Sequence, residues 1–157
     1  MDQRPSDTAT LRPFLADARR LLATAEDCMA HLQLIDDDAD ACHCLQQALS
    51  ALARRAALAG VDELTRYAEP LRYLLSLACQ APRLSEVLLL RTQACLDLLA
   101  WQLELLDPST GRIDLDEQEQ LRLLHDLAGA LDAQQRLIAS ADCGTPCTQG
   151  GGHSQPD

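Results

Sequence analysis

The sequence contains no lysine, and its positive charge is small. Thirteen arginines face twenty-four aspartates and glutamates, which gives a formal net charge of −11. A chain this acidic is repelled by nucleic-acid phosphates and by anionic lipid headgroups. Nucleic acid and membrane are therefore not expected partners. A protein partner is expected instead, either one that is locally basic or one that docks through an apolar patch.

Aromatic residues are also scarce, at 3% of the chain, and Trp101 is the sole tryptophan. Since apolar residues still make up 47%, the core must be built mainly from Leu, Ala, Val and Cys. Leucine and alanine are strong helix formers, which favours an all-α fold. No apolar run reaches the roughly 18 residues typical of a membrane-spanning helix. No signal-peptide pattern is visible either, so a cytoplasmic protein is expected.

The seven cysteines do not form an evident disulfide framework. Five of them lie within helical patterns, where a free thiol behaves as a small apolar side chain. Reduced thiols are therefore expected, in agreement with a cytoplasmic location. The five are Cys28, Cys42, Cys44, Cys79 and Cys95.

Apolar residues at steps of three and four predict five helices, at about 9–35, 39–59, 62–79, 84–106 and 116–140. Breaks follow at Asp36, at Gly60, at Pro82 and at the turn 107–111. Pro13 is expected in a first helical turn, where proline is tolerated. Short connections predict an antiparallel four-helix bundle with a fifth C-terminal helix. Residues 1–8 are expected to be a flexible N-terminus, 9–140 the bundle and 141–157 a disordered tail.

Motifs for metal binding or catalysis are weak. Cys42 and Cys44 are two residues apart and point in opposite directions on a helix, so they cannot chelate one ion there. Cys143 and Cys147 in the tail, with His153 nearby, could bind a metal or form a disulfide, but they lack the second pair of ligands that a zinc site needs. No nucleophile elbow and no glycine-rich phosphate loop is present. We therefore expect a protein that is not an enzyme and that binds no metal or cofactor.

The segment Gly60-Val61-Asp62-Glu63-Leu64-Thr65 has a close counterpart in one family. Together with the helix lengths over about residues 10–138, it resembles the histidine phosphotransfer (HPt) family, and is most similar to the N-terminal phosphotransfer domain of chemotaxis-type histidine kinases. In that family a His-x-Leu/Ile-Lys-Gly motif precedes the glycine by ten residues. The resemblance therefore implies that Ser50 occupies the phosphoacceptor position.

Three neighbouring positions depart from the family motif. At the positions of the family's histidine, lysine and glycine, this sequence has Ser50, Ala53 and Arg54. A supporting His and Glu on the third helix correspond to Glu69 and Arg72. Phosphorelay needs an imidazole nucleophile, and serine does not form the labile phosphoramidate that passes phosphate on. The resemblance thus implies a degenerate domain that does not relay phosphate.

We expect a pseudo-phosphotransfer module that docks a response-regulator receiver domain or a histidine kinase in bacterial two-component or chemosensory signalling. The predicted docking face comprises Gln46, Gln47, Ser50, Ala53, Arg54 and Ala57, bordered by Glu69 and Arg72. Two alternatives include phosphorylation. In one, His43, two turns before Ser50, accepts phosphate, and in the other the protein is a regulator phosphorylated on the Ser50 hydroxyl. An alternative function is that of a helical adaptor or chaperone-like module outside two-component signalling.

Overall fold

The computed structural model describes the backbone of residues 3–152 and the side chains of residues 11–140. It contains five α-helices, α1 (Gln3–Leu34), α2 (Ala39–Ala59), α3 (Asp62–Ala78), α4 (Glu86–Leu105) and α5 (Glu117–Gly152). Within the described residues there is no β-strand, and one isolated bridge joins Leu106 to Ile113. The predicted all-α class is confirmed.

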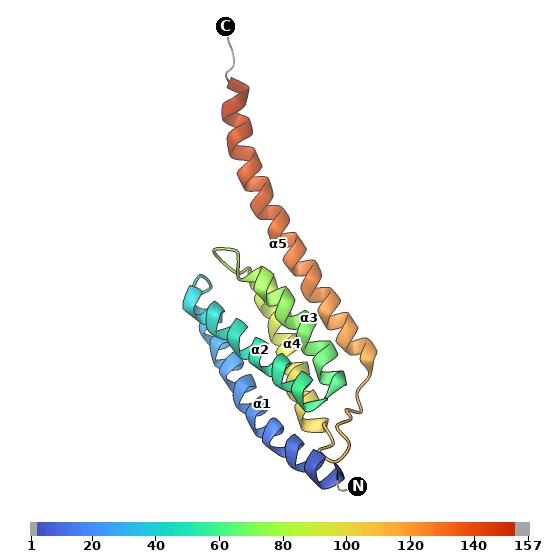
Figure 1. Ribbon diagram of the computed structural model, residues 1–157. Coiled ribbons are helices and arrows are strands. Elements are labelled where there is room, and N and C mark those ends of the chain that lie inside the picture. The colour runs from blue at the N-terminus through green and yellow to red at the C-terminus, as the bar shows by residue number, and fades with distance from the viewer. Residues whose placement is uncertain (1–2, 153–157) are drawn as a thin grey trace.

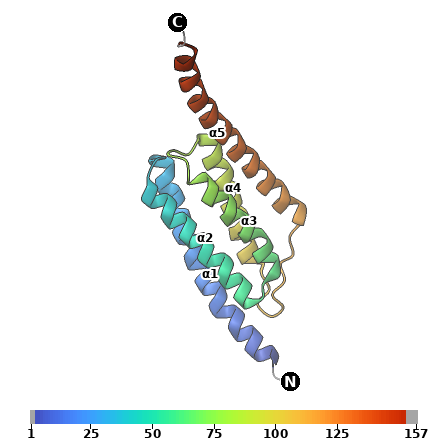
Figure 2. The ribbon, with the colours of Figure 1, turned by 45° about the horizontal axis from the view of Figure 1, so that its top comes forward.

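The first four helices form an antiparallel bundle (Figure 1). Helix α1 packs against α2 and α4, and α2 packs against α3. The fifth helix covers α4 and α3 and continues beyond the end of the bundle (Figure 2). Since α2 and α4 make no direct contact, they lie diagonally across the bundle and their outer faces look in different directions.

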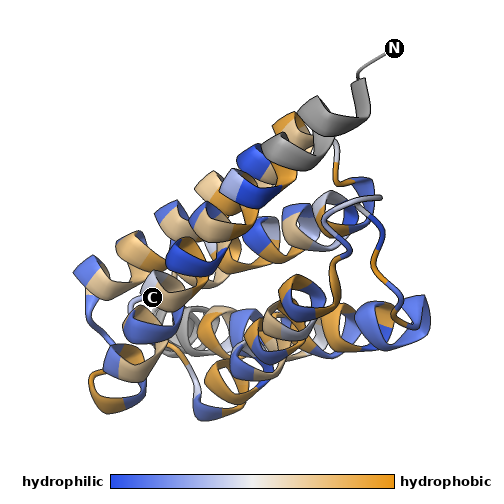
Figure 3. Cartoon of the chain, turned by 90° about the horizontal axis from the view of Figure 1, so that it is seen from below, coloured by the Kyte–Doolittle hydropathy of each residue, from blue (hydrophilic) through white to orange (hydrophobic). Residues whose placement is uncertain are grey.

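The core is aliphatic, as the composition predicts. Hydrophobic and hydrophilic segments alternate along the helices, which is the pattern of amphipathic helices sharing one core (Figure 3). The largest fully buried side chains are leucines from α1 to α4, with Met29 and Tyr67. The Tyr67 hydroxyl donates a hydrogen bond to the Cys95 carbonyl at 2.7 Å, which satisfies its only polar group. Burial raises the pKa of this hydroxyl well above its ordinary value.

The two outer helices are longer than predicted. Helix α1 begins at Gln3, so Pro13 lies inside it and not in its first turn. Helix α5 continues to Gly152, where periodicity predicts an end near Ser140. The periodicity ends earlier because the chain beyond Ser140 carries no apolar stripe to mark a buried face. The flexibility expected for residues 1–8 and 141–157 stays a prediction, and residues 1–2 and 153–157 lie outside the described part.

The described helices include none long and apolar enough to cross a lipid bilayer.

Candidate docking face on α2 and α3

Helix α2 is held at both ends by its own sequence. The Asp38 carboxylate accepts hydrogen bonds from the backbone N–H groups of Asp40 and Ala41 at 3.0 and 3.1 Å, the usual role of an N-cap residue. At the other end, Gly60 adopts φ = 77°, a left-handed conformation that glycine reaches without strain. Its N–H bonds back to Ala57, and that of Val61 bonds to Ala56. The helix therefore has fixed limits and a fixed outward face.

Five of the six residues predicted on the α2 docking face reach the surface. Gln47, Arg54 and Ala57 are exposed, and Gln46 and Ser50 are half-buried. The sixth, Ala53, is 0% exposed and belongs to the core. Placing Ala53 on the docking face is therefore wrong.

Ala53 lies three residues from Ser50, on a flank of α2 that is packed into the bundle. Ala48 and Ala56 are also buried, at 5% and 0% exposure. Alanine fits at such packed positions, and a close-packed interior leaves no room there for a long side chain.

The α2–α3 register places Ser50 beside the remaining candidate residues. Cys42 lies eighteen residues before Gly60, and Cys79, to which it is bonded, lies eighteen residues after Val61. The two helices therefore run side by side from a turn centred on Gly60 and Val61. By this register Ser50 lies at the level of the α3 segment between Glu69 and Arg72.

Glu69 and Arg72 bind each other on α3. The Arg72 guanidinium donates two hydrogen bonds to one Glu69 carboxylate oxygen, at 3.0 and 3.2 Å. Both side chains are partly exposed, so the pair contributes little to stability, in the range of ~0–1 kcal/mol. Its effect is to neutralise both charges in the place where the family resemblance implies a histidine and its supporting glutamate.

Among the described histidines, His43 lies nearest to the predicted face in sequence, two turns before Ser50 on α2. It is exposed and lines an open depression of about 270 Å³ together with Asp38 and the predicted docking residue Gln46. His31 Nε2 lies 2.7 Å from the Asp38 carboxylate, and His125 is exposed on α5. The predicted docking residues of α2 thus offer a hydroxyl, two glutamine amides and an arginine, which form hydrogen bonds, and none of them is an imidazole nucleophile.

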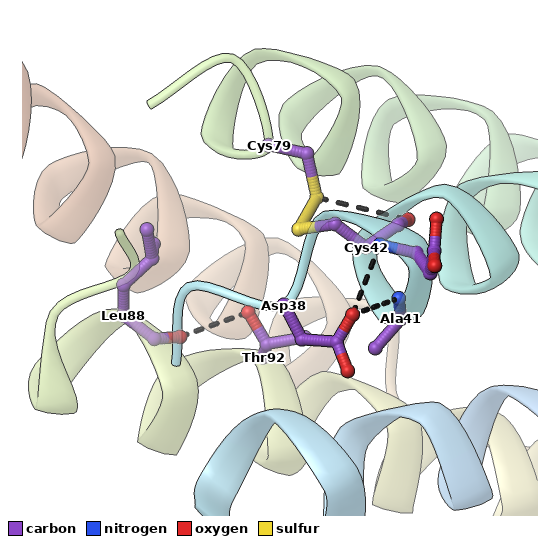
Figure 4. Close-up of a disulfide and its surroundings, with 7 residues drawn as sticks. Asp38, Ala41, Cys42, Cys79, Leu88 and Thr92 are labelled. Carbon is purple, nitrogen blue, oxygen red and sulfur yellow. Dashed lines mark hydrogen bonds between the residues drawn. A yellow bond between two sulfur atoms is a disulfide. The ribbon is translucent and has the colours of Figure 1, made fainter. Parts of the chain in front are cut away.

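The structure contains a disulfide that the sequence analysis did not predict. Cys42 of α2 is bonded to Cys79 just after α3, with the two Cα atoms 5.9 Å apart (Figure 4). The expectation of reduced thiols is wrong for these two residues. The signal was their equal distance from the Gly60–Val61 turn, which places them opposite each other in a helical hairpin.

Three other described cysteines are free, as expected. They are Cys28, Cys44 and Cys95. Burial raises the pKa of the Cys28 thiol to about 12, with a further contribution from its hydrogen bond with Cys44. Burial likewise raises the pKa of Cys95 to about 11. These thiols are protonated near neutral pH and act as apolar core residues.

The described side chains contain no group of three or more His, Cys, Asp or Glu placed to hold a metal ion. Cys143, Cys147 and His153, considered as possible ligands in the tail, lie outside the described side chains.

One solved structure has a similar fold. The chain matches the phosphorylated P1 domain of CheA3 from R. sphaeroides, whose crystal structure contains CheY6 in complex with it. The TM-score is 0.68 at 17% identity, over 80% of this chain and 98% of that domain. The fold is that of an HPt-like helical bundle. No family model and no curated protein sequence matches the chain.

Proposed function

We propose that this chain is a phosphotransfer-like docking module that binds a receiver domain without relaying phosphate. The proposal is carried by a serine, and not a histidine, at the half-buried α2 position that the family resemblance assigns to the phosphoacceptor, in a chain with an HPt-like fold. The matched P1 domain is phosphorylated and lies in complex with CheY6. A receiver domain of the CheY type is accordingly the proposed partner, in a bacterial chemosensory pathway.

Binding and transfer make separate demands on this face. Docking depends on shape and on a few well-placed contacts, which the glutamines, Ser50 and Arg54 can provide. Transfer also needs a nucleophile and a positive charge that stabilises the phosphoryl group. The Ser50 hydroxyl is a poor substitute for imidazole, and buried Ala53 adds no charge. The proposed module therefore keeps the first capacity and lacks the second.

Arg54 is the residue whose substitution tests the docking face. It is exposed and stands one helical turn after Ser50, on the same side of α2. In the resembled family a glycine at this position admits the receiver closely. We propose that the Arg54 guanidinium here contacts the receiver itself, whose acidic phosphorylation pocket complements a cation.

The test uses individually purified receiver domains from the chemosensory systems of the source cell, titrated calorimetrically with this chain. We expect at least one to bind, and Arg54→Glu to weaken that binding by tenfold or more, which corresponds to ~1.4 kcal/mol. Arg112→Glu, an exposed site in the loop before α5, is the charge-matched control and should change the affinity less than ~2-fold. No binding by any receiver, or equal effects of the two variants, would contradict the proposed docking face.

A further inference from the structure

Helix α4 is apolar on two opposite sides. Its inner side supplies fully buried core residues, including Leu96 and Leu99 at 0% exposure. Its outer side carries four large apolar residues that are far from buried. Val87 is 53% exposed, Leu90 62%, Trp101 60% and Leu105 42%. A side of a helix that carries several large apolar residues is normally covered, yet within the described chain these four side chains stay exposed.

These four residues lie on one side of α4 as two exposed pairs, which we call the α4 stripe. Along the helix, Leu90 follows Val87 by three residues and Leu105 follows Trp101 by four. Between the pairs, Ala94 is half-buried and Leu98 is 8% exposed, so the exposed surface is interrupted there. The spacing places both pairs on a single line that extends about 27 Å at ~1.5 Å per residue. Isolated exposed leucines are ordinary, but four large exposed apolar residues aligned on one side of a helix indicate a binding surface.

The border of the α4 stripe toward α1 is acidic. Glu86, Asp97 and Glu104 recur on that side of α4 and are all exposed. Gln93, on the same side, accepts a hydrogen bond from Gln33 of α1, which fixes the border at the α1–α4 seam. Glu26 of α1 adds to it, since its partial burial, with the charge of Asp97, raises its pKa.

An open depression lies where this border meets the end of α1. Its walls include Leu34, Ile35, Asp37 and Glu86, and its volume is about 450 Å³. Leu34 and Ile35 are 85% and 49% exposed. The depression repeats the chemistry of the α4 stripe, with apolar side chains next to carboxylates.

We propose that the α4 stripe and its acidic border bind an amphipathic helix of a partner protein, one with an apolar face and an arginine- or lysine-rich edge. Apolar anchors would pack on Leu90 and Trp101. The basic edge would lie over Glu86 and Asp97 and remove their mutual repulsion. This site is independent of receiver docking on α2, which lies diagonally across the bundle.

A second copy of the chain fits this surface poorly. Two α4 helices packed antiparallel about a two-fold axis bring the same border of each copy together. The acidic residues Glu86, Asp97 and Glu104 of one copy would then lie against the acidic border of the other copy. Each copy also carries a formal net charge of −11, which opposes self-association.

Trp101 provides a direct readout because it is the only tryptophan and lies within the stripe. The probe is a synthetic helical peptide with leucines at i, i+3, i+4 and i+7 and arginines along one edge. Titration should shift Trp101 emission to shorter wavelength, and the affinity should fall as salt rises. A peptide with glutamates in place of the arginines, and one with serines in place of the leucines, should bind at least ~10-fold more weakly.

Variants of the protein locate the site. Leu90→Ser should weaken peptide binding at least ~10-fold, whereas Leu58→Ser, at an 82% exposed leucine on α2, should change it less than ~2-fold. The double variant Glu86→Lys/Asp97→Lys should lose the arginine-edged peptide and gain the glutamate-edged one. Circular dichroism of each variant checks that the bundle is intact.

Four results would overturn the proposal. These are no shift of Trp101 emission, equal binding of the arginine and glutamate peptides, an equal effect of Leu58→Ser and Leu90→Ser, or a dimer in sedimentation that Leu90→Ser abolishes.

Discussion

Helices α2 and α4 occupy diagonal places in one bundle, yet their outer faces differ. Helix α2 turns polar and charged residues outward, among them Gln47 and Arg54, and packs leucines and alanines inward. Helix α4 is apolar on both sides and exposes Leu90 and Trp101. A bundle core constrains only the inner half of each helix, so the outer halves are free to differ. We interpret the difference as two binding faces for two kinds of partner, one recognised by polar contacts and one by an apolar seam.

The largest expected effect comes from placing a charge on the packed side of α2. Ala53→Lys restores the lysine of the resembled family motif but inserts a long cation at a 0% exposed position. We expect a loss of about 3 kcal/mol or more in the free energy of unfolding, because an unpaired buried charge and overpacking both destabilise. Urea unfolding followed by circular dichroism measures it.

Arg54→Lys is the matched control, since it places a lysine at the neighbouring exposed position. Its effect should stay within about 0.5 kcal/mol, as for ordinary surface substitutions. A stable Ala53→Lys variant would show that α2 can move away from its neighbours. Close packing at Ala53 would then not be what holds the α2 face in place.

The second prediction concerns the disulfide, which α2 has and α4 lacks. Cys42→Ser/Cys79→Ser removes a cross-link between residues 37 apart. Freeing that loop should lower the free energy of unfolding by ~2–4 kcal/mol. Dithiothreitol should produce a similar loss in the unmodified protein and none in the double variant. An unmodified protein whose unfolding midpoint ignores the reductant would contradict the cross-link.

A third prediction acts on the inner side of α4. Gln102 is 0% exposed, and neither atom of its amide has a partner among the described residues. Burying an unsatisfied amide is costly, so Gln102→Met should raise the free energy of unfolding by about 1 kcal/mol. The same substitution at exposed Gln135 of α5 should have almost no effect. Destabilisation by Gln102→Met would mean that the amide is hydrogen-bonded after all.

The smallest expected effect lies at the acidic border of the α4 stripe. Partial burial, with the charges of Asp97 and Asp27, raises the pKa of Glu26 in the folded protein. A raised carboxyl pKa means that the folded state binds a proton more tightly than the unfolded state does. The charged Glu26 therefore costs stability above its folded pKa, and that cost disappears as the pH falls below the ordinary glutamate value of about 4.3.

Glu26→Gln should accordingly raise the melting temperature slightly at pH 7, and the gain should vanish near pH 4. Melting curves of both proteins over this pH range measure it. A gain that persists unchanged at pH 4 would place its origin outside the carboxylate charge.

The inner helices were predictable from sequence more accurately than the surface. Helix α2 has the predicted limits 39–59, because Asp38 caps it and Gly60 ends it. The start of α1 and the end of α5 were missed, since no such residues mark them. The burial of Ala53 was also missed, because a leucine stripe identifies the core side of a helix but not how closely its flanks approach a neighbour. Pairing of Cys42 with Cys79 needed the hairpin register, and the exposure of Trp101 needed the packing of all the helices.

The most direct test of the central claim is phosphate transfer to the unmodified protein. The chain is incubated with an active chemotaxis-type kinase and radiolabelled ATP, and separately with a receiver domain that binds it, in phosphorylated form. Acid-labile phosphate on the chain is then measured and mapped. Because the family resemblance assigns the phosphoacceptor position to Ser50, and buried Ala53 supplies no charge, we predict none, even where binding is retained. Stoichiometric acid-labile phosphate on His43 would contradict the account and move the active centre two turns along α2.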